Sequence, residues 1–427
     1  MRRAAWGIAA ALVVAAIPIG LASAALGELD PTFSGDGWAR TWDFYGSTRP
    51  YFAKGAEDIV LQPDGKIVAV GEVYDSRGLV LGAVRWTPNG DLDRSFGEGG
   101  WAAGRLGHVP NAHAVALQTD GKIVVGGEID FEFAGIARFN ADGSLDRTFG
   151  NNGLVRDPSG FARFVFDVAV QRDGKIVTVG NHLSSRDRQL AMAVSRYLPN
   201  GALDPSFSSD GRVSINFGGG HENAYAVTLQ RNGKILVAGN ADRYGNDLAF
   251  AQLRPNGKLD RSFSRDGRQT VPFGLNRINR VRSLAVQHNG WIVAAGESRV
   301  LPRYEPSRIA LVRLKANGAL DRRFGKRRTA PTPHGGYAQA LALQPDGRIV
   351  VAGLAYEDAD YTTSSWALLR YRSNGRLDPS FGRGGIVVTD FGTGDDGAAA
   401  VAIQPDGRIV VGGEVYTDQA LARYRAR

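Results

Sequence analysis

The sequence predicts an all-β protein, a single seven-bladed β-propeller with four antiparallel strands in each blade. Two sequence motifs support this prediction, because each occurs seven times and the two alternate along the chain. The repeats are also out of phase with the chain ends, so that both ends are expected to supply strands to one shared blade. No segment has a sustained 3.6-residue apolar period, so helices are not expected.

The first motif is Gln-Pro-Asp-Gly-Lys-Ile-Val or a close variant of it. Successive copies are 53 to 60 residues apart, which is the length of one four-stranded blade. The glutamines that mark the copies are Gln62, Gln118, Gln171, Gln230, Gln287, Gln344 and Gln404.

The second motif is Leu-Asp-x-x-Phe, and six blades also carry an arginine before it, which Gln252 replaces in the fourth blade. We expect the aspartate to cap the following turn and the phenylalanine to fill the space between blades. One catalytic centre needs one copy of a residue, so these repeated residues are expected to be scaffold. Seven equivalent lectin-like pockets are the functional alternative. The aspartates are Asp30, Asp93, Asp146, Asp204, Asp260, Asp321 and Asp378.

Four strands can be placed in the first complete repeat, and we name them A to D from the inside of the ring outwards. Strand A is expected at 57–61, strand B at 66–72, strand C at 79–86 and strand D at 100–106. The A–B and C–D connections contain Asp-Gly and Asn-Gly, which predict two-residue hairpin turns with positive φ at both positions.

The chain ends predict how the ring closes. The segment 37–44 has the pattern of a D strand with no A, B or C strand before it. The segment 421–425 has the pattern of a C strand with no D strand after it. The last blade is therefore expected to contain three C-terminal strands and one N-terminal outer strand, which removes free sheet edges.

Residues 1–24 are expected to be a secretory signal peptide. Arg2 and Arg3 precede an apolar run to about Leu21, and Ala22-Ser23-Ala24 forms a cleavage site. Residues 25–427 are then the propeller, in a secreted or extracytoplasmic protein with no transmembrane span.

The composition narrows the function classes. There are no cysteines, which excludes disulfides and thiolate metal sites. Removing residues 1–24 lowers the formal net charge from +8 to +6, a mild excess that argues against a nucleic-acid partner. We expect a monomer that binds a protein or a carbohydrate at the cell surface.

The two motifs together resemble the delta-60 repeat family of bacterial propeller proteins, over residues 29–427. The resemblance implies a propeller, but it implies no activity and no catalytic residues.

Strand order places the irregular B–C and D–A loops on one face, and such loops on a rigid scaffold commonly carry binding residues. The main hypothesis is a non-enzymatic binding or interaction scaffold that uses this face, with no catalytic residue assigned. The aromatic and basic candidates in these loops are Tyr74, Arg243, Tyr244, Tyr304, Tyr356 and Tyr361.

The alternative hypothesis is a metal-dependent hydrolase of lactone or ester type, with its site at the mouth of the central channel. Acids, amides and a histidine near the starts of the A strands motivate it, although their spacing matches no known set. These residues are Glu57, Asp58, His113, Asp167, Glu222 and Asn223.

A calcium site is a further expectation. Two loops of the sixth blade carry six carboxylates that strand order brings to the same face, and flexible loops with oxygen ligands suit Ca²⁺. Solvent-exposed acids that bind no ion are the alternative. The six residues are Glu357, Asp358, Asp360, Asp390, Asp395 and Asp396.

Overall fold

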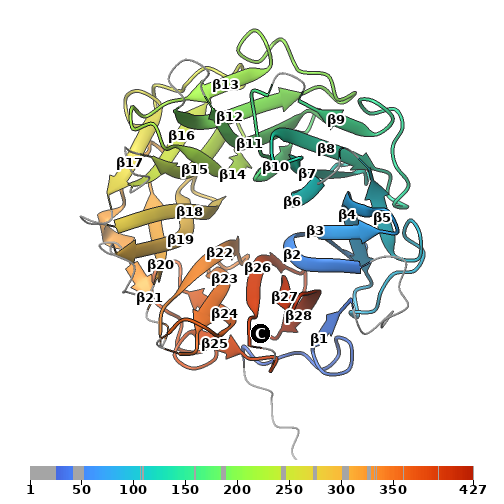
Figure 1. The fold of residues 1–427 in the computed structure, drawn as a ribbon. Helices are drawn as coiled ribbons and strands as arrows, with labels where there is room; N and C mark the ends of the chain where they lie inside the picture. The colour runs from blue at the N-terminus through green and yellow to red at the C-terminus, as the bar shows by residue number, and fades with distance from the viewer. Residues whose placement is uncertain are drawn as a thin grey trace, which may run out of the picture.

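A computed structural model confirms the seven-bladed propeller, with seven four-stranded antiparallel sheets arranged in a ring (Figure 1). The structure describes residues 26–41, 52–105, 107, 110–157, 160–183, 189–241, 247–272, 277–300, 307–324, 328–330, 332, 334–358, 360–392 and 394–426. The expected signal peptide lies outside these ranges. Within them no helix is long and apolar enough to cross a bilayer.

The first four blades follow one another along the chain. Blade 1 contains β2 (Phe52–Leu61), β3 (Ile67–Asp75), β4 (Gly78–Trp86) and β5 (Trp101–Gly104). Blade 2 contains β6 (Pro110–Leu117), β7 (Ile123–Ile129), β8 (Phe133–Phe139) and β9 (Leu154–Arg156). Blade 3 contains β10 (Asp167–Val170), β11 (Ile176–Leu183), β12 (Leu190–Tyr197) and β13 (Arg212–Ile215). Blade 4 contains β14 (Asn223–Leu229), β15 (Ile235–Ala241), β16 (Asp247–Leu253) and β17 (Arg268–Pro272).

The remaining three blades complete the ring. Blade 5 contains β18 (Arg277–Val286), β19 (Ile292–Val300), β20 (Arg308–Leu314) and β21 (Arg328–Ala330), with the 3₁₀ turn η2 (Arg322–Phe324) before β21. Blade 6 contains β22 (Gly336–Leu343), β23 (Ile349–Tyr356), β24 (Ser364–Tyr371) and β25 (Ile386–Thr389). Blade 7 contains β26 (Gly397–Ile403), β27 (Ile409–Val415), β28 (Asp418–Tyr424) and β1 (Trp38–Arg40).

The A–B turns differ from the prediction. In blade 1 the Gln62 N–H donates to Lys66 O at 2.8 Å and the Gly65 N–H donates to Gln62 O at 2.9 Å. Of the turn residues, Gly65 has a positive φ of 85° whereas Asp64 does not. The connection is thus a three-residue loop closed by a glycine in the left-handed region, and the predicted two-residue turn was wrong.

The ring closes as predicted, through a shorter strand. β1 pairs antiparallel with β28, with Trp38 opposite Ala422 and Arg40 opposite Ala420. Residues 42–44 of the predicted strand lie outside the described residues. The closing contact is also apolar, since Phe33 is fully buried in the cluster between blades 7 and 1.

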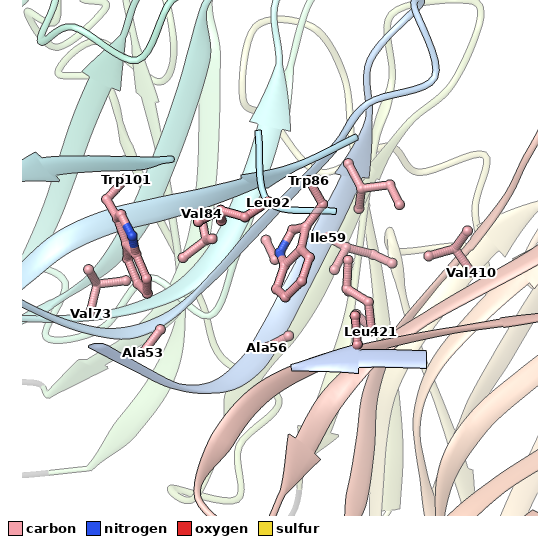
Figure 2. Close-up of a cluster of buried hydrophobic side chains, with 14 of the residues drawn as sticks. Ala53, Ala56, Ile59, Val73, Val84, Trp86, Leu92, Trp101, Val410 and Leu421 are labelled. Carbon is pink, nitrogen blue, oxygen red and sulfur yellow. The ribbon is translucent and has the colours of Figure 1, made fainter. Parts of the chain in front are cut away.

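Figure 2 shows this cluster, which is typical of the packing between neighbouring blades. Trp86 and Trp101 of blade 1 lie over small A-strand residues, Ala53 and Ala56, whose methyl groups leave room for the indoles. Leu421 of blade 7 packs into the same cluster, so apolar contact runs from one sheet to the next.

Candidate functional site

The propeller has two different faces. The A–B and C–D turns lie at one end of the strands, and we call this end the turn face. The B–C and D–A loops lie at the other end, and we call it the loop face. The A strands surround the centre of the ring, which we call the channel (Figure 1).

On the turn face the repeated residues form a buried network. In blade 1 the Arg85 Nε donates to Asp93 Oδ2 at 2.8 Å, and Asp93 Oδ1 accepts from the N–H of Ser95 at 3.1 Å. Arg85 Nη1 also donates to the carbonyl of Ala141 in the next blade at 2.5 Å. Burial opposes ionisation of Asp93, but hydrogen bonds from Ser95 and Lys66 and the charge of Arg85 outweigh it and lower its pKa to about 2.

The same network recurs around the ring, and we call it the repeat network. Each of six arginines bonds an aspartate of its own blade and a carbonyl of the next blade, which fastens neighbouring sheets together. The guanidinium carbons also lie 4.4 to 5.0 Å from the centroids of the motif phenylalanines. These contacts bear out the expected scaffold roles. The arginines are Arg85, Arg138, Arg196, Arg313, Arg370 and Arg423.

The channel is lined by bulged A strands. Six of the seven A strands have a register shift against their B strands, and a bulge redirects a side chain out of the regular alternation. From blade 2 to blade 5, side chains at this position form a continuous arc. His113 and Phe166 have ring centroids 6.1 Å apart, Phe166 and Tyr225 are 5.1 Å apart, and the Arg282 guanidinium lies 4.9 Å from the Tyr225 centroid.

On the other side of the channel the arc gives way to a cavity. Gln339, Ala399 and Glu57 occupy the corresponding positions in blades 6, 7 and 1. They line a cavity of about 330 Å³, which we call the channel pocket. Its further lining includes Tyr337 and Glu414, together with several glycines and alanines whose small side chains leave the space open.

Carboxylates dominate the channel pocket. Glu57, Asp395, Asp396 and Glu414 line it, and no lysine, arginine or histidine is found among the described residues of its lining. Poor solvation of the Glu414 carboxyl group, together with the charge of Glu57, raises the pKa of Glu414 to about 7. The pKa of Glu57 is also raised, by poor solvation and by Glu72. The pocket thus holds negative charge that is only partly compensated.

Three B–C turns on the loop face present aromatic residues in an unusual backbone conformation. Phe131, Tyr361 and Tyr416 have φ values of 57°, 60° and 62°, in the left-handed region that aromatic residues rarely adopt. Phe131 and Tyr416 are 59% and 65% exposed. Backbone strain of this kind concentrates at binding and catalytic sites.

The structure places three of the six predicted binding residues on the loop face. Tyr356 and Tyr361 contact each other edge to face, with ring centroids 5.1 Å apart. The Tyr74 hydroxyl donates to Glu72 Oε2 at 2.9 Å. The other three, Arg243, Tyr244 and Tyr304, lie outside the described residues.

Four of the six predicted calcium ligands lie outside the channel pocket, and each of the four is either exposed or hydrogen-bonded to a different partner. Asp358 accepts hydrogen bonds from Thr362 and Thr363 of its own loop. The side chain of Asp390 accepts from the Gly392 N–H, and Glu357 accepts from the Ser365 hydroxyl. Asp360 is exposed.

Two of these six acids belong to the channel pocket. Asp396 is buried and accepts from the N–H groups of Phe391 and Tyr416, at 3.3 and 3.1 Å, whereas Asp395 is exposed. Among the described residues no three His, Cys, Asp or Glu side chains are grouped to hold a metal. Calcium binding therefore stays a prediction.

Three of the carboxylates that suggested a hydrolase, Asp58, Asp167 and Glu222, have structural partners. Asp58 Oδ2 accepts from the Val115 N–H of the next blade at 2.9 Å, and Asp167 Oδ2 accepts from the Val227 N–H at 2.7 Å. Glu222 accepts from the Phe217 N–H at 2.8 Å. These carboxylates order the A strands and their loops, and their hydrogen bonds give the hydrolase hypothesis no support.

Known structures of similar fold have varied functions. The structure of the WD40 β-propeller domain of Doa1 is similar at a TM-score of 0.50 and 14% identity, over 88% of this chain and 97% of that chain. An ulvan lyase of a new polysaccharide lyase family is similar at a TM-score of 0.50 and 10% identity, over 88% and 95%. A gluconolactonase from Xanthomonas campestris has a TM-score of 0.41 at 14% identity, over 73% and 85%. Identities this low establish the fold alone.

No curated protein sequence is significantly similar to the chain. A family model does match it, once in each blade and over more than half of its residues in total. The matches cover residues 62–96, 118–149, 171–207, 230–263, 287–324, 344–381 and 404–426. Each match begins at a repeat glutamine, so the match confirms that the repeats are those of a β-propeller family. The chain therefore belongs to the family described as a domain of unknown function (DUF5122) β-propeller.

Proposed function

We propose that the chain is an exported, non-enzymatic binding module that docks a partner protein on its loop face and takes one lysine or arginine side chain of that partner into the channel pocket. The observation that carries the proposal is the pocket itself. Glu57, Asp395 and Glu414 come from three loop or strand segments and line one cavity, whose described lining residues include no basic one. A cationic group from outside would compensate this charge.

The size and walls of the pocket favour a side chain over a larger ligand. Its volume of about 330 Å³ is near the lower end of the range for small-molecule sites. The Tyr337 side chain in its lining offers an aromatic surface to a cation. The backbone N–H of Tyr416 donates to Asp396 Oδ1, so an exposed aromatic turn is tied directly to the pocket wall.

The exposed aromatic turns would supply the surrounding contact area. Tyrosine is enriched among the residues that dominate binding energy, because its ring buries a large area and has few rotatable bonds. Tyr361 of blade 6 and Tyr416 of blade 7 lie on the same face as the pocket, on blades that line it. A partner protein would therefore contact aromatic rings around a central basic residue.

Short peptides test the charge preference. Pentapeptides with one arginine or lysine between glycine and serine residues would be titrated into the mature chain and followed by NMR chemical shifts. Matched peptides would carry citrulline or acetyllysine instead. We expect the basic peptides alone to bind, with dissociation constants of about 1 mM. Binding should weaken at high salt and strengthen from pH 6 to pH 8 as Glu414 ionises.

Two variants locate the binding. Glu57→Gln combined with Glu414→Gln should abolish it, whereas Glu132→Gln, which changes an exposed acid on the same face, should leave it intact. Equal binding of basic and neutral peptides would contradict the proposal, as would binding that survives the double substitution. A titration with CaCl₂ distinguishes this proposal from the predicted calcium site. A response to calcium without any response to basic peptides would replace the docking site by a cation site.

A further inference from the structure

One blade departs from the repeat network on the turn face. In six blades a lysine or arginine directly after the A–B turn forms an ion pair with the aspartate of the Leu-Asp-x-x-Phe motif. Blade 5 has Trp291 at this position instead. The six ion pairs are Lys66–Asp93, Lys122–Asp146, Lys175–Asp204, Lys234–Asp260, Arg348–Asp378 and Arg408–Asp30.

The exchange of a cation for an indole changes the local chemistry. The Arg313 guanidinium lies 4.4 Å from the Trp291 centroid and 4.4 Å from the Phe324 centroid, so it contacts both rings. Two of its nitrogens donate to Asp321, at 2.9 and 2.7 Å. The charge of Arg313 is therefore already paired, and the described residues around Trp291 include no unpaired lysine or arginine.

Trp291 lines a cavity of about 780 Å³ between blades 5 and 6, which we call the Trp291 pocket. It is larger than the corresponding grooves between blades 3 and 4, about 420 Å³, and between blades 4 and 5, about 470 Å³. Those grooves are lined by charged side chains such as Arg172, Asp173 and Arg231, whereas the lining of the Trp291 pocket has no acid and no lysine.

The polar groups of the Trp291 pocket are mostly neutral hydrogen-bonding groups, with His288 beside them. Gln287, Gln344, Ser373 and Asn374 line it beside apolar Leu343. Gln344 is only 5% exposed, and its Oε1 accepts no hydrogen bond in the described structure. A buried acceptor without a partner is costly, so a ligand hydroxyl that donates to Gln344 would be favourable.

We propose that the Trp291 pocket binds a neutral saccharide unit on the turn face, opposite the loop face used by the proposed partner protein. A pyranose ring has apolar C–H faces that can lie on an indole, and hydroxyl groups around its edge that amides and hydroxyls recognise. The pocket combines these two features without unpaired charge. Its volume also lies within the range of about 300–1,000 Å³ typical of ligand sites.

The test uses a panel of four neutral hexasaccharides, which are cellohexaose, hexa-N-acetylchitohexaose, laminarihexaose and maltohexaose. Binding to the mature chain would be followed by saturation-transfer NMR and isothermal titration calorimetry. We expect at least one of them to bind. Trp291→Lys, which restores the residue type of the other blades, should weaken that binding at least about tenfold while leaving the melting temperature unchanged or raised, since a lysine can pair with Asp321.

Two further variants serve as controls for saccharide binding. Trp291→Phe should retain measurable binding, because it keeps an aromatic surface. Lys122→Met, at the same repeat position in blade 2, should bind like the unchanged chain. The proposal is overturned if no hexasaccharide binds at millimolar concentration, if charged oligosaccharides or peptides bind instead, or if Trp291→Lys folds and binds as well as the unchanged chain.

Discussion

The two faces of the propeller differ in how regularly their residues repeat from blade to blade. On the turn face nearly every blade repeats the same buried residues, and a guanidinium of one blade bonds the backbone of the next. On the loop face the described residues recur less regularly. A glutamate follows a glycine in strand B of four blades, at Glu72, Glu128, Glu297 and Glu414, and the aromatic turns and most pocket carboxylates are concentrated at particular blades. Sequence repetition therefore marks the residues that hold the ring together, and departures from the repeat mark the places where a ligand can be distinguished.

Within the turn face, blade 4 differs from the other blades, and it can be compared with blade 2. Gln252 replaces the repeat arginine there, and the buried Asp260 is left with Lys234, whose Nζ lies 2.5 Å from Asp260 Oδ2, and the half-exposed Arg254, whose Nε lies 3.7 Å from Oδ1. In blade 2 the corresponding Asp146 has both Arg138, at 2.8 Å, and Lys122, at 3.3 Å. Lys234 is therefore expected to contribute more to stability than Lys122, its counterpart in blade 2.

Opening the ring is expected to have the largest effect. Removal of residues 26–41 deletes β1, exposes the edge of β28 and removes both Phe33 and the partner of Arg423. The shortened protein should aggregate or lose its single cooperative unfolding transition. Calorimetry and size-exclusion chromatography would measure this. A truncated chain that melts like the mature one would show that closure contributes little.

A smaller effect is expected from the lysines of the repeat network. Lys234→Met should lower the free energy of unfolding by about 2 kcal/mol, because the buried Asp260 loses its main charged partner. Lys122→Met should cost less than about 1 kcal/mol, because Asp146 keeps Arg138. Urea denaturation would compare the two.

Gln252→Arg provides the control, since it adds the arginine that blade 4 lacks. In the Lys234→Met background it should recover most of the lost stability. Equal costs for the two lysines, or no recovery with Gln252→Arg, would mean that blade 4 compensates Asp260 by other means.

A pH dependence is also expected from the channel. Burial raises the pKa of Asp58 to about 7 and that of Asp167 to about 8, where the charge of Asp58 adds to the effect. The folded chain thus retains protons that the unfolded chain releases above about pH 4. Stability from these groups is complete at low pH and is lost as the pH rises through 7 to 8.

Asp58→Asn combined with Asp167→Asn isolates this contribution. Between pH 5 and 8.5 the free energy of unfolding of the unchanged chain should fall relative to that of the double variant, with a slope of at most about 1.4 kcal/mol per pH unit for each proton. Parallel pH profiles for the two proteins would show that both carboxylates are well solvated in the folded state.

Much of the scaffold could be predicted from the sequence, because each of its positions is sampled seven times. The glutamine and aspartate motifs gave the number of blades, the strand order and the closure of the ring. The turn type was missed, since Asp-Gly occurs both in two-residue turns and in longer loops that end with a glycine in the left-handed region. Gly65 follows the second pattern.

The candidate sites were predicted less well, because each depends on one residue that differs from its equivalents. The channel pocket exists where Ala399 replaces the larger residues of the other A strands, and a bulge determines that this position lies at the pocket. No strand pattern indicates such a bulge. Trp291 did leave a signal, since six copies of the motif have a lysine or arginine where it has a tryptophan.

The pairing of β1 with β28 has a consequence for how the chain reaches its native state. Arg40 must pair with Ala420, which is 380 residues further along the chain, before the seventh sheet is complete. Contacts of such sequence separation form slowly, because a very long loop must close first. Six sheets can assemble from local hairpins as synthesis proceeds, whereas β1 must remain unpaired until β28 has been made. The rate of folding should therefore be limited by the encounter of the two chain ends.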